Sequence, residues 1–310
     1  KRTRATVNER VFVEIIDVDI VEEKQPHLTH MRKLRSNART TTRLLSDPDP
    51  DIFSAIRQVL LNCGIEVRSC LRAGLDSDGR LVRQRSWKLI TLLDRKTANA
   101  DFISFCKRGG ENLNLEKGVW LLIKTTFPHI NQESYQKVLD GYAERVSKDC
   151  NPQQSFPSTL MAINRVFFNE EGFLGDKTNY YDPQNSYLNR VIDRKLGNPI
   201  SLCLLYIFIA SRLRLPLVGV AMPGHFILRL QSSTFNIFVD PFNMGNLLSQ
   251  SQCEERLKGC GFGFKSDFLS AVSPRRILLR ICSNLHQIYQ KAQNFGERDR
   301  IQDYLITLAN

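Results

Sequence analysis

The chain has 310 residues, of which 42% are hydrophobic and 24% charged, a composition typical of a globular protein with one medium-sized domain and smaller modules. Its longest apolar run, Leu202 to Ala210, is far shorter than the roughly 20 residues that a membrane helix needs, so we expect no membrane span. Nothing at the start resembles a signal peptide, and the net charge of +11 raises the question of a nucleic-acid partner.

The eight cysteines are scattered and form no CxxC pair. Structural zinc sites usually show short paired spacings between their ligands, so we expect neither a metal nor another cofactor. Scattered thiols without a secretory signal are typical of the reducing cytoplasm, where we expect this protein.

Basic residues are concentrated near the N-terminus. Residues 1–43 form a basic and poorly defined segment, in which five Arg and Lys side chains between Arg32 and Arg43 have no acidic neighbour in the sequence. Only Val11 to Val21 has the β-branched composition of a strand. No RNA- or DNA-binding motif accompanies the charge, and elsewhere basic and acidic residues are mixed. Nucleic-acid binding through this segment is therefore only a weaker alternative.

Two helix pairs are predicted over residues 44–95. The cluster Asp47-Pro48-Asp49-Pro50 is a helix start, and Cys63-Gly64 ends that helix before a second one over Ile65 to Leu75. The starting pattern recurs 29 residues later, at Asp76. A helix pair repeated at about this period is typical of an α-solenoid, and the segment resembles HEAT repeats.

Four further helices are predicted, two before the centre of the chain and two after it. Leu115 to Lys124 and Glu133 to Val146 belong to a domain over residues 96–270. Over residues 271–310, a helix from Pro274 to Gln293, a Gly-containing turn and a final helix resemble one tetratricopeptide repeat. A single repeat cannot form the concave groove of such arrays, so we expect a helical cap on the core.

The centre of the chain predicts a buried helix followed by three strands. Asn198 is a favoured N-cap and Pro199 a favoured first helical residue. From Ile200 to Ala210 the helix is apolar nearly all round, so it has no polar face and is expected to be buried up to about Leu213. Strand patterns follow over residues 218–220, 222–230 and 235–240.

The last two strands bring a histidine and an aspartate together. If their hairpin turns between Ser232 and Ser233, His225 lies directly opposite Asp240. Opposed residues of an antiparallel pair have Cβ atoms about 4.5–5.5 Å apart, so an imidazole can meet a carboxylate. Such a carboxylate fixes the tautomer of a catalytic histidine and supports its positive form. A slip of one residue would place the two side chains on opposite faces of the sheet.

Six short motifs occur in order across the middle of the chain. They are Ile163-Asn164-Arg165, Tyr180-Tyr181-Asp182-Pro183, Asn185-Ser186-Tyr187-Leu188-Asn189, Gly197-Asn198-Pro199-Ile200-Ser201-Leu202, Pro223-Gly224-His225-Phe226 and Asp240-Pro241-Phe242. Together they resemble the SirB-type branch of the transglutaminase-like superfamily. The resemblance implies an α+β fold with a papain-like core, in which a buried helix packs against an antiparallel sheet.

In active members of this superfamily, a Cys in the first turn of the central helix attacks an amide carbonyl. By resemblance, His225 and Asp240 are the catalytic His and Asp, whereas Pro199 occupies the position of the Cys, a change that the whole branch shares. Ser201 lies about 200° around the helix from Pro199, so it points away from the site and is expected to cap the helix. Cys203 shares the face of Pro199 but lies about 6 Å further along, and is expected as a small core residue.

Further polar residues near the motifs are expected to line the cleft. They are Asn185, Tyr187 and Asn243, together with Asn198, Pro199 and Ser201 of the helix start. Alternatively, Asn185 caps the next helix and Tyr187 fills the core. Asn243-Met244-Gly245 replaces the Gly-Gly pair that the family usually shows after Asp-Pro-Phe, so we expect a reshaped loop beside the site.

The sequence therefore predicts a transglutaminase-like domain that has lost its catalytic cysteine and binds a protein or peptide in the former cleft, as a pseudoenzyme. The alternative is an acyl-transfer enzyme, namely an amidase, peptidase or cross-linker. It would use Cys203 or Ser201 with His225 and Asp240. The sequence alone leaves open whether the protein is an enzyme.

Overall fold

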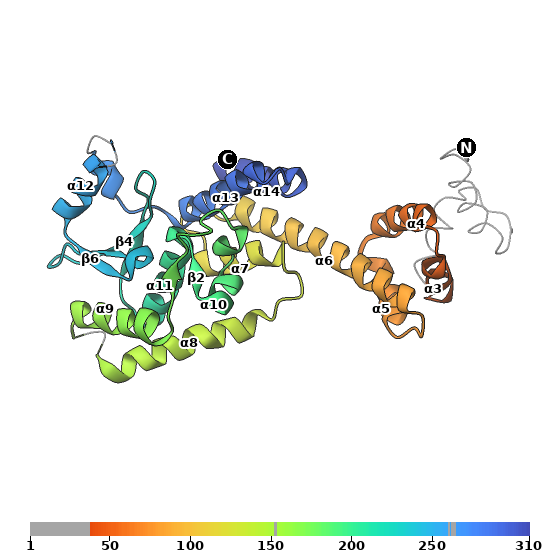
Figure 1. Cartoon of the computed structure of the whole chain (residues 1–310), viewed down its shortest axis with the longest axis horizontal. Coiled ribbons are helices and arrows are strands. Elements are labelled where there is room, and N and C mark those ends of the chain that lie inside the picture. Colours follow the sequence, from red (N-terminus) through yellow and green to blue (C-terminus); the bar gives the residue numbers. More distant parts are fainter. Residues whose placement is uncertain (1–37, 152–153, 260, 262–264) are drawn as a thin grey trace. The chain divides into compact units, whose positions relative to one another are not determined.

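The computed structural model describes residues 38–151, 154–259, 261 and 265–310 (Figure 1). The strand predicted over Val11 to Val21, with most of the basic segment, lies outside the described residues. By their internal contacts the residues form two compact units. The first ends at Asn99 and also includes Thr125–His129, and the second consists of Ala100–Lys124 and Ile130–Asn310.

The first unit is helical. Its elements are α3 (Ala38–Ser46), α4 (Pro50–Asn62), the 3₁₀ turn η1 (Gly64–Val67), α5 (Arg68–Leu75) and the first part of α6 (Arg80–Arg108). The side chain of Asp49 accepts a hydrogen bond from the backbone N–H of Asp51, which caps α4 at its predicted start. Buried side chains of these helices form one core, among them Leu45, Leu60 and Leu71.

One long helix, α6, stands where a second helix pair was predicted from Asp76. Its 29 residues contain neither Gly nor Pro, so nothing in the sequence interrupts its backbone hydrogen bonds. The prediction of a second helix pair is therefore wrong, and the predicted boundary after residue 95 lies inside α6. At the other end, α3 begins at Ala38, inside the segment predicted to be poorly defined.

The second unit surrounds one buried helix, α11 (Pro199–Arg212). Its other helices are α7 (Leu115–Lys124), α8 (Gln132–Asp149), α9 (Phe156–Asn164), α10 (Leu188–Arg194), α12 (Gln250–Gly259), α13 (Pro274–Lys291) and α14 (Phe295–Ala309). Single turns are η2 (Arg165–Glu170, a π-helical turn), η3 (Pro183–Ser186), η4 (Pro241–Asn243) and η5 (Ser266–Leu269). The helices predicted before and after the centre are confirmed as α7, α8, α13 and α14.

The sheet of the second unit is small and antiparallel. It consists of β3 (Leu217–Val220), β4 (Ile227–Leu230), β5 (Phe238–Asp240) and β6 (Asn246–Leu248), hydrogen-bonded in that order. A separate parallel pair joins β1 (Leu174–Gly175) to β2 (Leu196–Gly197). Because α11 contacts both β3 and β4, the buried helix packs against the sheet, and the predicted α+β class is confirmed.

The register of β4 and β5 differs by two residues from the prediction. Leu228 lies opposite Val239, whereas the predicted hairpin would have paired it with Ile237. The cause is the turn: the hydroxyl of Ser232 accepts hydrogen bonds from the backbone N–H groups of Thr234 and Phe235, which carries the bend one residue further along the chain. A shift of two residues keeps every side chain on its predicted face of the sheet.

Candidate functional site

A hydrogen-bonded His–Asp pair lies at the end of the sheet. A turn through Pro223 and Gly224, in which Gly224 has a φ of 72°, ends just before His225, and β4 begins only at Ile227. Asp240 is the last residue of β5. The Nε2 of His225 lies 3.0 Å from the Oδ1 of Asp240, so the predicted hydrogen bond is present despite the shifted register.

The carboxylate of Asp240 is fully buried and accepts several hydrogen bonds. Its Oδ2 accepts hydrogen bonds from the side chains of Asn243 (2.8 Å) and Arg256 (2.7 Å), and Oδ1 accepts from the backbone N–H of Asn243 (3.4 Å). Burial alone would raise the pKa of the Asp240 carboxyl, but the bonds from His225, Asn243 and Arg256 outweigh burial and lower it to about 2. The ionised carboxylate makes Nε2 of His225 the donor, which leaves Nδ1 for a group in the adjacent space.

Pro199 occupies the first helical position of α11, next to this pair. Asn198 caps the helix, because its side chain accepts from the backbone N–H of Ser201 at 3.0 Å. In return, the hydroxyl of Ser201 accepts from the N–H of Asn198 at 3.0 Å and donates to its carbonyl at 3.1 Å. Ser201 is thus a buried capping residue whose hydroxyl already has both a donor and an acceptor in Asn198.

Cys203 lies one turn further along α11 and is fully buried. Its thiol donates to the backbone carbonyl of Phe226 at 3.4 Å. Burial raises the pKa of the Cys203 thiol well above its usual range, and the nearby negative charge of Asp240 raises it further. The thiol therefore stays protonated at neutral pH, and its proton is already directed at a backbone carbonyl.

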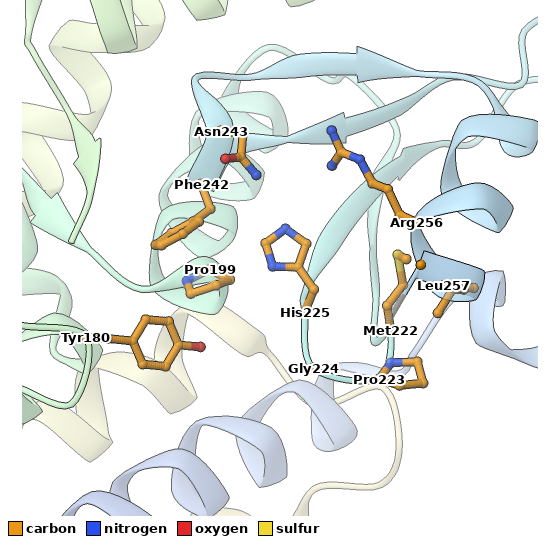
Figure 2. Close-up of a pocket in the computed structure, with 11 residues that line it drawn as sticks. Tyr180, Pro199, Met222, Pro223, Gly224, His225, Phe242, Asn243, Arg256 and Leu257 are labelled. Atoms are coloured by element: carbon orange, nitrogen blue, oxygen red, sulfur yellow. The ribbon is translucent and has the colours of Figure 1, made fainter. Parts of the chain in front are cut away.

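A cavity of about 650 Å³ opens beside His225. Its lining residues are Tyr180, Pro199, Met222, Pro223, Gly224, His225, Phe242, Asn243, Arg256, Leu257 and Gly259. Figure 2 shows Pro199, Phe242 and Tyr180 on one side of the imidazole, and Met222, Pro223 and Leu257 on the other. Cavities of this size commonly hold small ligands or side chains. Among these described lining residues there is no Cys, Ser or Thr.

Residues 133–283 match the family model described as transglutaminase-like superfamily. A UPF0162 protein of Xylella fastidiosa is 34% identical over 204 residues, which cover 64% of this chain and 73% of that protein. The chain belongs to the UPF0162 proteins, and its residues 133–283 form a domain of the transglutaminase-like superfamily.

Other relatives of this chain come from bacteria and animals. A UPF0162 protein of Pseudomonas aeruginosa is 35% identical over 180 residues, which cover 57% of this chain and 65% of that protein. F-box only protein 21 of Mus musculus is 34% identical over 134 residues, which cover 41% of this chain and 21% of that protein. No solved structure matches the chain.

Several residues predicted to line the cleft of the transglutaminase-like domain lie elsewhere. The Asn185 side chain donates to Asp176 (3.1 Å) and to the carbonyl of Asn179 (2.9 Å), in a buried polar network. The hydroxyl of Tyr187 lies 3.0 Å from that of Tyr289, inside the core. Neither side chain is among the residues that line the cavity beside His225, and the burial of Tyr187 agrees with the alternative expectation that it fills the core. Asn198 and Ser201 likewise serve the helix start, whereas Pro199 and Asn243 do line the cavity.

Arg256 was not predicted to belong to the site. It comes from α12, and its guanidinium donates to Oδ2 of Asp240, whereas His225 bonds to Oδ1 of the same carboxylate. No motif or spacing in the sequence connects it to the aspartate. Tyr180, Pro223 and Phe242 do belong to the motifs that carry the family resemblance, and that signal could have identified them.

Two further expectations concern metals and membranes. Over the part of the chain that the structure describes, no three His, Cys, Asp or Glu side chains form a group that could hold a metal ion. No helix among the described residues is long and apolar enough to cross a membrane.

Proposed function

We propose that this transglutaminase-like domain binds a protein or peptide segment in the cavity beside His225 and performs no cysteine-dependent acyl transfer. The observation that carries the proposal is Pro199, which lines the cavity at the helix position where the resemblance expects the nucleophile. Proline has neither a thiol nor a hydroxyl, and papain-like chemistry needs a nucleophile within hydrogen-bond reach of the imidazole, about 2.6–3.2 Å.

Cys203 is a poor substitute for the missing nucleophile. Its thiol donates to the carbonyl of Phe226, and burial keeps it protonated. A buried helix cannot move by one turn without repacking its whole surface, so Cys203 cannot replace Pro199 by sliding. Ser201 is a poor substitute as well, because its hydroxyl is already bonded to the backbone of Asn198 in the helix cap.

The second candidate is an acyl-transfer enzyme. The specific observation in its favour is the intact pair of His225 and Asp240, which has the hydrogen bond that a catalytic base requires. Such a pair also has a use without catalysis, since it fixes the end of β5 and presents one imidazole nitrogen to a bound peptide. We favour the binding function because the cavity-lining residues that the structure describes include no Cys, Ser or Thr beside this pair.

The finer family assignment is also part of the proposal. The order of the motifs favours the SirB-type branch, and α13 with α14 is consistent with one tetratricopeptide-like helix pair. Both would suit a protein that acts through protein contacts.

Thiol labelling tests the loss of cysteine chemistry. The native protein is incubated with a peptide carrying a thiol-reactive electrophile, and the labelled positions are identified by mass spectrometry. We expect labelling of Cys203 to be no faster in the wild type than after His225→Ala. Selective labelling of Cys203 that disappears in the His225→Ala variant would show that the imidazole activates this thiol. The acyl-transfer function would then replace the binding function that we propose.

Peptide selection tests the binding function. A phage-displayed library of random heptapeptides is selected on the full chain, and the retained peptides are measured against His225→Ala. Since His225 offers the cavity one hydrogen bond, we expect about tenfold weaker binding without it. His286→Ala is the matched control, because this half-buried histidine lies on α13 and does not line the cavity. Equal binding to both variants would refute the proposal.

A further inference from the structure

A row of aromatic rings connects the His–Asp pair to the surface. The ring of Phe242 lies 6.0 Å from that of His225, and the ring of Tyr180 lies 6.2 Å from Phe242, both edge-on. Tyr181 continues the row at 5.2 Å from Tyr180. The exposed fractions of Tyr180 and Tyr181 are 38% and 54%, so the outer half of the row is open to a partner.

The walls of the cavity inside this row are mostly apolar. Two of its lining residues, Met222 and Leu257, are almost fully buried, and Pro199 and Phe242 form the side toward α11. The polar groups that reach the cavity are few, chiefly His225, Asn243 and Arg256, and the last two are bonded to Asp240. An apolar side chain therefore fits this space better than a charged one.

Positive charge flanks the outer end of the row. The ammonium group of Lys291 lies 3.6 Å from the centre of the Tyr181 ring. Arg280 lies eleven residues before Lys291 on the same helix α13, which places both residues on one face of that helix. Burial raises the pKa of Tyr180, whereas the charge of Arg280 lowers it. Among the described residues, the ion pairs nearest in the sequence join Arg298 to Asp299 and Arg300 to Glu297, and neither pair involves Lys291 or Arg280.

The carboxylates that lie within a few residues of this row in the sequence are already occupied. Asp240 is fully buried and accepts from His225, Asn243 and Arg256. Asp176 is buried and accepts from Asn185, and Asp182 pairs with Arg194 at 3.1 Å. The outer end of the row thus has two cations whose charge no nearby described carboxylate balances.

We infer that the occupant of the cavity is an acidic peptide segment, in which a bulky apolar side chain enters the cavity and neighbouring Asp or Glu side chains meet Arg280 or Lys291, which lie eleven residues apart on α13. The inference rests on the proposed binding function and specifies its ligand. The aromatic row guides the segment from the exposed tyrosines to His225, whose Nδ1 accepts a hydrogen bond from a peptide N–H. Both features of the segment are needed, since the cavity selects the apolar residue and the two cations select its acidic neighbour.

The phage selection described above provides the test. We expect retained heptapeptides to carry Phe, Tyr, Trp, Leu or Met within two residues of Asp or Glu. The most enriched sequence is then synthesised with an amidated C-terminus and measured against the double variant Arg280→Glu/Lys291→Glu. Because each exposed ion pair contributes little and reversal adds repulsion, we expect about tenfold weaker binding, and partial recovery at high salt.

A double variant with the same change of net charge serves as the control. Lys107→Glu/Lys137→Glu alters two exposed lysines outside the cavity and should bind as the wild type does. Circular dichroism checks the folding of both double variants, and Arg280→Gln/Lys291→Gln should give an intermediate loss if the charges act as inferred.

The outcomes separate this inference from the proposed function. If the retained peptides are neutral or basic but still depend on His225, the acidic-segment inference is overturned while the binding function stands. If no retained peptide depends on His225, both fail. Loss of binding in Arg280→Glu/Lys291→Glu but not in the control supports the inference.

Discussion

Replacing Asp240 with Asn tests the electrostatic centre of the site. In the wild type the buried carboxylate accepts hydrogen bonds from His225, Asn243 and Arg256. An amide at this position keeps the shape but removes the negative charge, and its NH₂ group would face donors. Arg256 is partly exposed and can turn to water, so the substitution costs less stability than breaking a fully buried ion pair would. We expect the free energy of unfolding to fall by about 2–3 kcal/mol at neutral pH.

The pH dependence of the unfolding free energy gives a more specific prediction for Asp240. The pKa of Asp240 falls from its ordinary 3.8 to about 2 in the folded protein. A lowered folded-state pKa stabilises the fold above the ordinary pKa, by about 2.5 kcal/mol here, and the stabilisation disappears as the pH falls through the folded-state value. At pH 3 about 1 kcal/mol of it should be lost. The difference in unfolding free energy between the wild type and Asp240→Asn should therefore shrink by about 1 kcal/mol between pH 7 and pH 3.

Urea unfolding followed by tryptophan fluorescence measures this difference. The chain has two tryptophans, and a Trp87→Phe background leaves Trp120, which is buried in α7 of the same unit as the site. Asp101→Asn is the matched control, since this exposed aspartate of α6 should show neither effect. If the difference between the wild type and Asp240→Asn stays constant from pH 7 to pH 3, the carboxylate is not held ionised by its partners, and our account of the pair is refuted.

Three further substitutions separate structural roles from binding, and the same unfolding assay measures each of them. Ser201→Ala removes half of the reciprocal cap with Asn198 and should lower the unfolding free energy by about 1–2 kcal/mol without changing peptide binding; a loss of binding would return Ser201 to the site. Tyr187→Phe deletes the hydrogen bond to Tyr289 and should lower it by about 1 kcal/mol, again without affecting binding. Met244→Gly relieves a left-handed backbone with a φ of 57° and should raise it by about 0.5–1 kcal/mol; a decrease would mean that the exposed methionine packs against its surroundings.

The sequence predicts the core of the domain well because strong local signals determine it. Asn198 and Pro199 start α11, and an apolar surface all round the helix requires burial, whatever it packs against. The hydrogen bond between His225 and Asp240 is also predicted, although the register is two residues off. It survives because side chains of a strand alternate between faces, so only an odd shift would have separated the pair.

The rest of the site depends on contacts that local patterns do not encode. Arg256 reaches Asp240 from α12, after a separate strand, and no periodicity links the two residues. Asn185 and Tyr187 belong to a family motif, but their side chains turn to Asp176 and Tyr289. Proximity to a motif in the sequence therefore does not place a side chain in the cavity. The continuity of α6 was missed for a different reason, because apolar spacing alone cannot tell one long helix from two short ones.

Restoring a thiol at the helix start tests whether the cavity keeps the geometry of an acyl-transfer site. In Pro199→Cys the new side chain lies at the first position of α11, beside His225 and within reach of the positive end of the helix dipole. A neighbouring imidazole and a helix N-terminus both lower the pKa of a thiol. We therefore expect this thiol to react with iodoacetamide at least about tenfold faster than buried Cys203 at neutral pH. Pro274→Cys is the matched control, because Pro274 also opens a helix, α13, and does not line the cavity. Faster labelling at position 199 than at 274, reduced to the rate at 274 by His225→Ala, would show that the imidazole still faces the lost nucleophile. Equal rates at both positions would mean that the His–Asp pair is aimed elsewhere, and the reason for placing a ligand next to Nδ1 of His225 would fall with it.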